Sequence, residues 1–294
     1  MSVRGGATRG EYGMAASDHE GRLGEEFFTP GTSSFTEFLA AHRPELLATG
    51  TPHRGVRAPE APHGTTILAL TYGDGVLVAG DRRATMGNLI AQRDLEKVLP
   101  ADDHTAIAIA GTVGIALEMV RLYQVELAHF EKIEGIPMTL TAKATRLAAM
   151  IRQNLAQAMQ GLAVVPLLAG YDTTAPGGGR GRIFSFDAAG GRYEKSAFHA
   201  EGSGSPYARG ALKKLYRPGM ARDEAVLAAL EALYDAAEDD SATGGPDVAR
   251  RIFPVVSVIT EDGYERLTET DVRRLSLTVV ERRRSRPDGP NAPV

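Results

Sequence analysis

The chain has 294 residues, a formal net charge of −4 and no cysteine. The lack of cysteine excludes disulfides, a thiol nucleophile and cysteine-ligated zinc, and the mild acidity argues against a dedicated nucleic-acid-binding protein. No apolar run approaches a membrane-spanning length and the first residues lack the apolar segment of a signal peptide, so we expect a soluble cytoplasmic protein.

Residues 1–64 are rich in glycine, proline and charge, and they are predicted to be mobile. Within them, residues 34–43 combine capping-box spacing with a short apolar face. This pattern fits a docking helix and an incidental amphipathic turn equally well. Residues 50–64 contain three prolines among glycines and charges, which predicts an extended linker that proteases can reach.

From Thr65 onward the sequence shows the patterns of one folded domain, predicted over 65–283. The expected elements, in chain order, are strands over 65–72, 76–81, 97–101 and 105–111, a helix from 112, a helix after 137 that runs to about 160, strands over 164–171, 182–187 and 193–199, helices over 204–216 and 222–238, a strand over 252–260 and a helix over 269–283. Hairpins alternating with helix pairs indicate an α+β fold with two sheets packed face to face and helices on both outer sides. Residues 284–294 are predicted to be a disordered tail.

Counting residues across the two predicted hairpins places four polar or glycine positions at sheet ends. In the first hairpin, Asp81 falls opposite Ile67 and so within a residue or two of Thr65. In the second, Lys97 and Gly111 share one end of the ladder. The sequence does not fix whether these two ends coincide.

If the two ends coincide, the four residues can perform acyl transfer. A threonine freed at its amino end carries a hydroxyl nucleophile and an α-amine that titrates near about 8 and can act as its base. A lysine ammonium favours the unprotonated amine, and an aspartate keeps that lysine charged. A glycine N–H at a strand-to-helix junction suits an oxyanion. Taken singly, a buried Lys–Asp pair and a glycine before a helix are more often structural.

Several motifs, in this order and spacing, resemble the β subunit of the 20S proteasome. They are Gly64-Thr65-Thr66-Ile67, the stretch 79–83, Lys97, the stretch 110–112, the stretch 202–205 and the stretch 240–245. The similarity covers about residues 65–280, and 170–191 together with 240–247 resemble the actinobacterial type. The resemblance implies a four-layer αββα sandwich of the N-terminal nucleophile hydrolase class. It also makes residues 1–64 a propeptide, removed by autocatalytic cleavage between Gly64 and Thr65.

The resemblance implies roles for residues at matching positions. Thr65 is the nucleophile, Asp81 and Lys97 support it, and the N–H of Gly111 binds the oxyanion. The motifs around the threonine amine contribute Ser203, Asp240, Ser241 and Thr243. Thr243 stands where many relatives have serine. Because threonine also carries a hydroxyl, we expect the hydrogen-bonding role of this position to persist. Arg83 matches a structural arginine beside the site.

A substrate cleft is implied in the same way. The backbones of Thr85 and Val113 would hold the substrate as an added strand. The pocket for the residue before the cut would draw on six apolar residues, namely Ala84, Leu95, Leu99, Ile109, Val113 and Leu117. Because none is charged, we predict cleavage after large hydrophobic residues, although some of the six could face the core instead.

The resemblance further implies two seven-membered β rings between two seven-membered α rings, written α7β7β7α7. A ring-shaped ATPase unfoldase would deliver proteins tagged with a ubiquitin-like modifier through the α ring. Neither a cofactor nor a metal is implied, and the seven histidines show no metal-ligand spacing. No nucleic-acid or membrane partner is implied either.

Two other interpretations remain open. One is a non-catalytic ring subunit of the same fold, against which the intact Gly64, Thr65, Asp81 and Lys97 count. The other is a simpler bacterial protease of identical subunits that serves a different unfoldase. The motif near residue 240 and the longer C-terminal region favour the proteasome over this second alternative.

Overall fold

The computed structural model describes residues 64–175 and 180–290 of the chain. The predictions for residues 1–63 and 291–294, including the helix near 34–43 and almost all of the linker, lie outside these residues. No helix in the described ranges is long and apolar enough to span a membrane.

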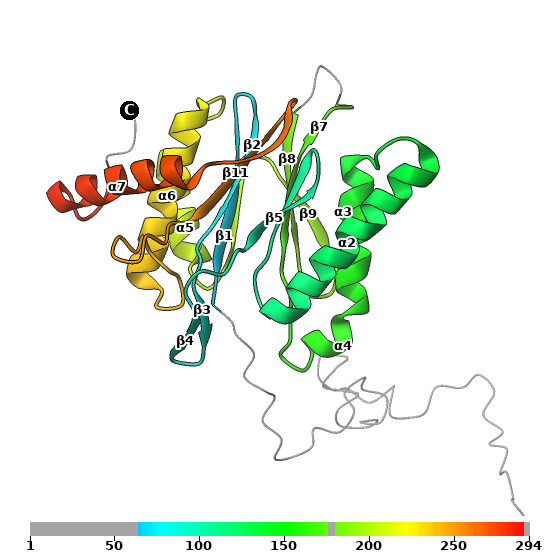
Figure 1. Ribbon diagram of the computed structural model, residues 1–294, viewed down its shortest axis with the longest axis horizontal. Coiled ribbons are helices and arrows are strands. Elements are labelled where there is room, and N and C mark those ends of the chain that lie inside the picture. The colour runs from blue at the N-terminus through cyan, green and yellow to red at the C-terminus, as the bar shows by residue number, and fades with distance from the viewer. Residues whose placement is uncertain (1–63, 176–179, 291–294) are drawn as a thin grey trace, which may run out of the picture. The chain divides into compact units, whose positions relative to one another are not determined.

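Two five-stranded antiparallel sheets form the centre of the domain (Figure 1). The first has the order β10-β1-β2-β11-β12, with β1 (Thr66–Tyr72), β2 (Gly75–Gly80), β10 (Phe198–Gly202), β11 (Val255–Thr260) and β12 (Gly263–Arg266). The second has the order β5-β6-β7-β8-β9, with β5 (Val98–Asp102), β6 (Thr105–Ala108), β7 (Leu167–Asp172), β8 (Arg180–Phe186) and β9 (Arg192–Lys195). A separate hairpin joins β3 (Ala84–Met86) to β4 (Leu89–Gln92).

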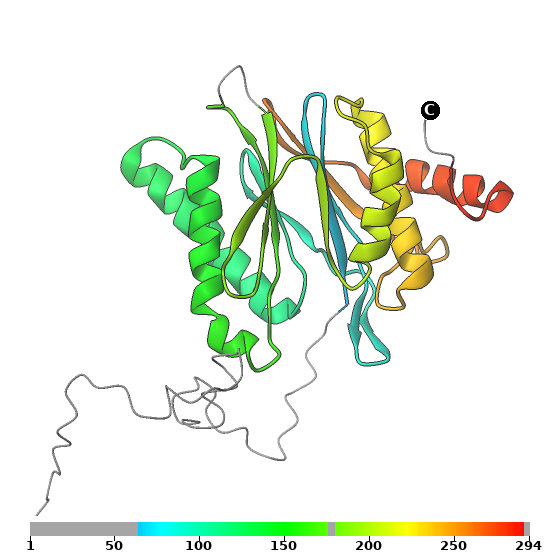
Figure 2. The same cartoon turned by 180° about the vertical axis from the view of Figure 1, so that it is seen from behind.

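Helices cover the outer face of each sheet, as Figures 1 and 2 show from opposite sides. The second sheet is covered by α2 (Val113–Glu134) and α3 (Leu140–Gln153), and the short α4 (Leu155–Ala158) follows at the end of α3. The first sheet is covered by α5 (Ser205–Leu215) and α6 (Arg222–Asp239), with α7 (Glu269–Ser285) packed on α6. The predicted four-layer αββα sandwich is therefore confirmed.

Strand β1 shows why the sequences of the central strands are continuous runs of apolar residues. Its side chains alternate, so Ile67 and Ala69 pack between the two sheets while Leu68 and Leu70 pack under α5 and α6. All four are fully buried, because a strand with a sheet on one face and helices on the other has no solvent side. This packing fixes β1, and with it Thr65 immediately before it.

Several local predictions differ from the structure. The predicted strand 193–199 is two strands, β9 and β10, which belong to different sheets, so the chain crosses the sandwich there. The helix predicted to reach residue 160 ends at Gln153 and restarts as α4. The β3–β4 hairpin was not predicted, because its strands are short and β4 is exposed along its whole length.

The chain also stays folded beyond the predicted domain end at residue 283. Helix α7 continues to Ser285. Arg283 donates a hydrogen bond to the carbonyl of Pro287 (3.1 Å), and Gly289 is buried against the same guanidinium. The prediction of a disordered tail over 284–294 is therefore wrong for residues 284–289, which lie in the part of the chain that the structure describes.

Candidate active site

Thr65 lies immediately before β1 and is almost fully buried, with 2% of its surface exposed. Its hydroxyl donates a hydrogen bond to the carbonyl oxygen of Gly64 at 2.5 Å. Gly64 has φ of 104°, and a Cβ there would overlap the Thr85 hydroxyl and approach the Ala242 Cβ to 2.8 Å. Glycine is thus required at position 64 both by its backbone conformation and by the lack of space.

Lys97 reaches the same carbonyl from the other sheet. It precedes β5, and its Nζ donates to Gly64 O (3.2 Å), to Asp81 Oδ1 (2.6 Å) and to the carbonyl of Arg83 (2.5 Å). The side chains of Lys97 and Asp81 are 1% and 0% exposed. The two hairpin ends that the sequence left unrelated therefore meet, with Thr65, Asp81 and Lys97 in one hydrogen-bonded group.

Asp81 is held by backbone donors as well as by the lysine. Its Oδ1 accepts from the N–H of Thr66, and its Oδ2 accepts from the N–H groups of Arg83 and Gly244, each at 2.8 Å. A buried carboxylate is stable only when its oxygens are paired in this way. Asp81 is therefore fixed in position and available as the counter-charge of Lys97.

The burial of Lys97 changes its acidity. Desolvation lowers the pKa of Lys97 below the usual lysine value, while the charge and hydrogen bond of Asp81 act in the opposite direction and Arg83 adds a smaller lowering. A buried lysine of lowered pKa gives up and takes back a proton more readily than a surface lysine. Lys97 is thus placed to polarise the carbonyl of Gly64, to which it donates at 3.2 Å.

A second polar group lies on the other side of Thr65. Ser203 Oγ and Thr243 Oγ1 each donate to Asp240 Oδ2 at 2.6 Å, and the serine also makes a longer contact (3.4 Å) to the carbonyl of Thr65. Ser241 differs from these, because its contribution is a backbone carbonyl that accepts from Arg83 Nη1 at 3.0 Å.

Gly111 follows β6 and precedes α2, with φ of 97° and its Cα close to the backbone of Ala163. It forms an isolated bridge with Val164 in which the hydrogen bonds belong to the flanking residues, so its own N–H points to the opposite side. On that side Ile109, two residues earlier, donates to the carbonyl of Lys97 at 2.9 Å. The Gly111 N–H therefore points toward the edge of the second sheet at which Lys97 precedes β5.

The six predicted pocket residues divide into two groups. Ile109 belongs to the apolar layer between the second sheet and helices α2 and α3, and Leu99 and Leu117 pack at its margin. Ala84 and Leu95 are buried near the active-site hairpins, and Val113 is half-buried at the beginning of α2. Part of the set contributes to the core, and the pocket itself stays a prediction. Thr85, at 9% exposure, belongs to β3, and its role at the substrate edge also stays a prediction.

Sequence reasoning missed two residues that hold the site together. The hydroxyl of Thr66 contacts Thr243 Oγ1 at 2.7 Å, and the N–H of Gly244 binds Asp81. Both lie inside motifs already noted, but nothing in the linear pattern relates residue 66 to residue 243.

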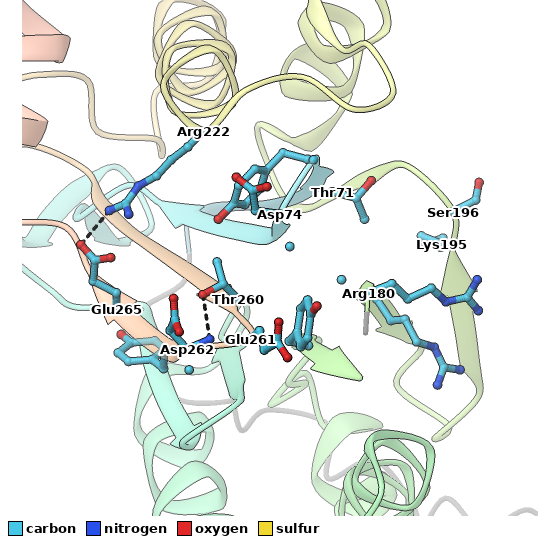
Figure 3. A pocket seen from close by; sticks show the side chains of 18 of the residues that line it. Thr71, Asp74, Arg180, Lys195, Ser196, Arg222, Thr260, Glu261, Asp262 and Glu265 are labelled. Carbon is cyan, nitrogen blue, oxygen red and sulfur yellow. Dashed lines mark hydrogen bonds and ion pairs between the residues drawn. The ribbon is translucent and has the colours of Figure 1, made fainter. Parts of the chain in front are cut away.

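A cavity of about 1000 Å³ lies at the opposite end of the sandwich, between the β1–β2 and β11–β12 turns (Figure 3). The first five residues of β1 lie between Thr65 and the nearest lining residue, Thr71, a distance of about 20 Å. Ion pairs such as Arg222–Glu265 (2.6 Å) line it, and none of the residues grouped around Thr65 does. Despite its size, this distal cavity is not where the nucleophile lies.

Comparison with known proteins agrees with the geometry. A family model described as proteasome subunit matches residues 61–249. Proteasome subunit beta 1 of Streptomyces avermitilis is 75% identical, over 95% of this chain and 99% of that protein. Proteasome subunit beta 2 of Thermomonospora curvata is 59% identical, over 92% and 96%, and a proteasome subunit beta of Acidothermus cellulolyticus is 56% identical, over 95% and 97%.

Replacing Asp81 with asparagine tests the buried pair. Asp81→Asn leaves Lys97 buried without a counter-charge, so the free energy of unfolding should fall by about 3–5 kcal/mol. Glu96→Gln is the matched control, because it breaks the exposed Glu96–Arg266 pair (2.7 Å) and should cost about 1 kcal/mol or less. Denaturant titration measures the free energy of unfolding of both variants. Equal losses of unfolding free energy in the two would contradict the importance of the buried pair.

Tyr72 gives a pH-dependent test at the distal cavity. Burial raises the pKa of Tyr72 to about 12, and its hydroxyl has no hydrogen-bond partner within the described ranges. Because an unfolded tyrosine titrates near about 10, the unfolded state loses its proton first, and stability falls as pH rises from about 10 through 12.

Tyr72→Phe should therefore increase the unfolding free energy by about 1–2 kcal/mol at neutral pH and reduce the loss on going to about pH 11. The control is Tyr264→Phe, which breaks the 2.8 Å bond to Ser257 and should lower stability at neutral pH. Denaturant titration at the two pH values measures both, and a destabilised Tyr72→Phe variant would contradict the expectation.

Proposed function

We propose that this chain, which belongs to the proteasome subunit family, is a threonine endopeptidase, the β subunit of a 20S proteasome. The observation that carries this proposal is the convergence of two groups on one peptide bond. The hydroxyl of Thr65 and the ammonium of Lys97 both reach the carbonyl oxygen of Gly64, at 2.5 and 3.2 Å.

The first reaction in this proposal is self-cleavage. Thr65 Oγ attacks the carbonyl carbon of Gly64, and the hydrogen bond from Lys97 stabilises the negative charge that develops on the carbonyl oxygen. The proton that Oγ loses passes, directly or through water, to the nitrogen as the C–N bond breaks, and the acyl group rests on Oγ as an ester. Water hydrolyses this ester, which releases residues 1–64 and leaves Thr65 with a free α-amine.

The mature enzyme would use the same residues on other peptides. Oγ of Thr65 attacks the substrate carbonyl, and its proton passes to the α-amine directly or through water. Lys97, with its lowered pKa and held by Asp81, favours the unprotonated amine. The N–H of Gly111 binds the oxyanion, and Ser203, Asp240 and Thr243 surround the amine. An acyl-enzyme forms, and water releases it.

The wider biology belongs to the same proposal. As a proteasome β subunit the chain assembles with α subunits in stacked rings. The seven-fold α7β7β7α7 arrangement, the ATPase unfoldase, a ubiquitin-like tag on the substrate and the cytoplasmic location are inferred from the family resemblance. A non-catalytic ring subunit is disfavoured, because such a subunit has no need for the hydrogen-bonded groups on both sides of Thr65.

Substitution of Thr65 tests the nucleophile. Thr65→Ala should abolish both the loss of residues 1–64 and peptide hydrolysis, because no hydroxyl remains at the site. Thr65→Ser keeps the hydroxyl and should retain activity, at a reduced rate because the β-methyl no longer restricts χ1. Peptidase assays and intact mass of the assembled particle measure both, and hydrolysis by the alanine variant would overturn the proposal.

Peptide substrates that differ only in the residue before the cut test the apolar pocket. Peptides with leucine or tyrosine there should have kcat/KM at least about tenfold higher than peptides with aspartate or lysine, since an apolar pocket leaves a charge unpaired. Varying the residue after the cut is the control. Equal rates for apolar and charged peptides would show that the six apolar residues do not form the pocket.

A further inference from the structure

We propose that Thr66, the residue after the nucleophile, is a positioning residue that couples the Asp81–Lys97 pair to the Asp240 group. The proposal rests on the catalytic role proposed above for Thr65. Thr66 is fully buried, and its backbone and its side-chain hydroxyl bond to different sides of the site.

The backbone of Thr66 fixes the first side. Its N–H donates to Asp81 Oδ1 at 2.8 Å, the same oxygen that Lys97 binds at 2.6 Å. Its carbonyl accepts from the N–H of Asp81 at 3.1 Å. Thr66 and Asp81 are therefore joined by two bonds across the ends of β1 and β2, and Lys97 depends on this arrangement for its counter-charge.

The hydroxyl of Thr66 fixes the second side, and proton counting gives the direction of its bond. A carboxylate only accepts, and each hydroxyl has one proton. Ser203 Oγ and Thr243 Oγ1 both lie 2.6 Å from Asp240 Oδ2, so both donate to it. The Thr243 hydroxyl therefore has no second proton to donate. In the 2.7 Å contact between the two hydroxyl oxygens, Thr66 must be the donor and Thr243 the acceptor.

The result is a one-way series of donors from Thr66 through Thr243 to Asp240. A donor bound to the Thr243 oxygen polarises that hydroxyl and keeps its proton directed at the carboxylate oxygen of Asp240. Without Thr66 Oγ1, the Thr243 hydroxyl can rotate away, and Ser203 is then the one hydroxyl that holds Asp240 Oδ2, while the Ala242 N–H binds the other carboxylate oxygen. The group beside the Thr65 amine would lose its fixed geometry, although the substrate cleft would be unchanged.

The space around these hydroxyls supports a dedicated contact. Thr66 and Thr243 are both 0% exposed, so no solvent replaces the bond between them. Gly204 lies against the pair, where a Cβ would overlap Thr66 Oγ1 and approach Thr243 Oγ1 to 2.7 Å. The β-methyl of each threonine restricts χ1 and thus the direction of its hydroxyl.

Three variants in the assembled particle test this inference. Thr66→Val has the same shape without the hydroxyl, Thr66→Ala is smaller and avoids overpacking, and Thr66→Ser keeps a hydroxyl donor. With peptide substrate, the valine and alanine variants should lose about tenfold in kcat, the effect of one hydrogen bond, with KM unchanged. The serine variant should recover most of the wild-type kcat.

A double variant shows whether Thr66 acts through Thr243. The kcat of Thr66→Val combined with Thr243→Val should equal that of Thr243→Val alone, because the series is already interrupted. Thr71→Val is the matched control, since it removes a hydroxyl bonded to Tyr216 (2.9 Å) at the far end of β1 and should leave kcat unchanged.

The results for the Thr66 variants can be distinguished from the result of the test of Thr65 as the nucleophile. Rates are normalised to subunits that start at Thr65 by intact mass, so a processing defect does not enter kcat. Wild-type kcat in Thr66→Val or Thr66→Ala, failure of Thr66→Ser to restore it, or losses that multiply in the double variant would each overturn the role of Thr66. Thr65→Ala remains the test of the proposed function itself.

Discussion

The structure depends on one buried ion pair, between Asp81 at the end of the first sheet and Lys97 at the edge of the second. Two charges without solvent are costly, and the cost is offset only because each is fully bonded. Asp81 takes three backbone N–H groups and the lysine, while Lys97 takes two carbonyls and the carboxylate. Most of these partners lie at or next to the end of a strand, while Gly244 lies in the segment between α6 and β11.

The sandwich supplies the rigidity that this pair requires. Strand β1 is apolar on both faces, so its beginning cannot shift without moving the core of both layers. One of the two Lys97 carbonyl acceptors belongs to Gly64, the residue whose peptide bond we propose is cut. The Asp81–Lys97 pair that stabilises this end of the sandwich therefore also holds the Lys97 ammonium against the Gly64 carbonyl. The same atoms contribute to the stability of the fold and to the proposed reaction.

The sequence predicted the layers and the first hairpin because apolar alternation and turn residues are local signals. It placed Asp81 opposite Ile67, whereas the register pairs Ile67 with Gly80, since the turn contains two residues, Gly73 and Asp74, rather than three. The meeting of Asp81 with Lys97 could not be predicted from pairing rules, because it depends on how two sheets stack. The Thr66–Thr243 bond joins residues 177 positions apart and leaves no linear pattern at all.

The central claim is that the carbonyl held between Thr65 Oγ and Lys97 Nζ is the bond that is cut. N-terminal sequencing of this subunit, isolated from the assembled and active particle, tests it most directly. The account predicts that the first residue is Thr65 and that the mass lost equals residues 1–64. An active particle whose subunit still begins at Met1, or at any residue other than Thr65, would contradict it.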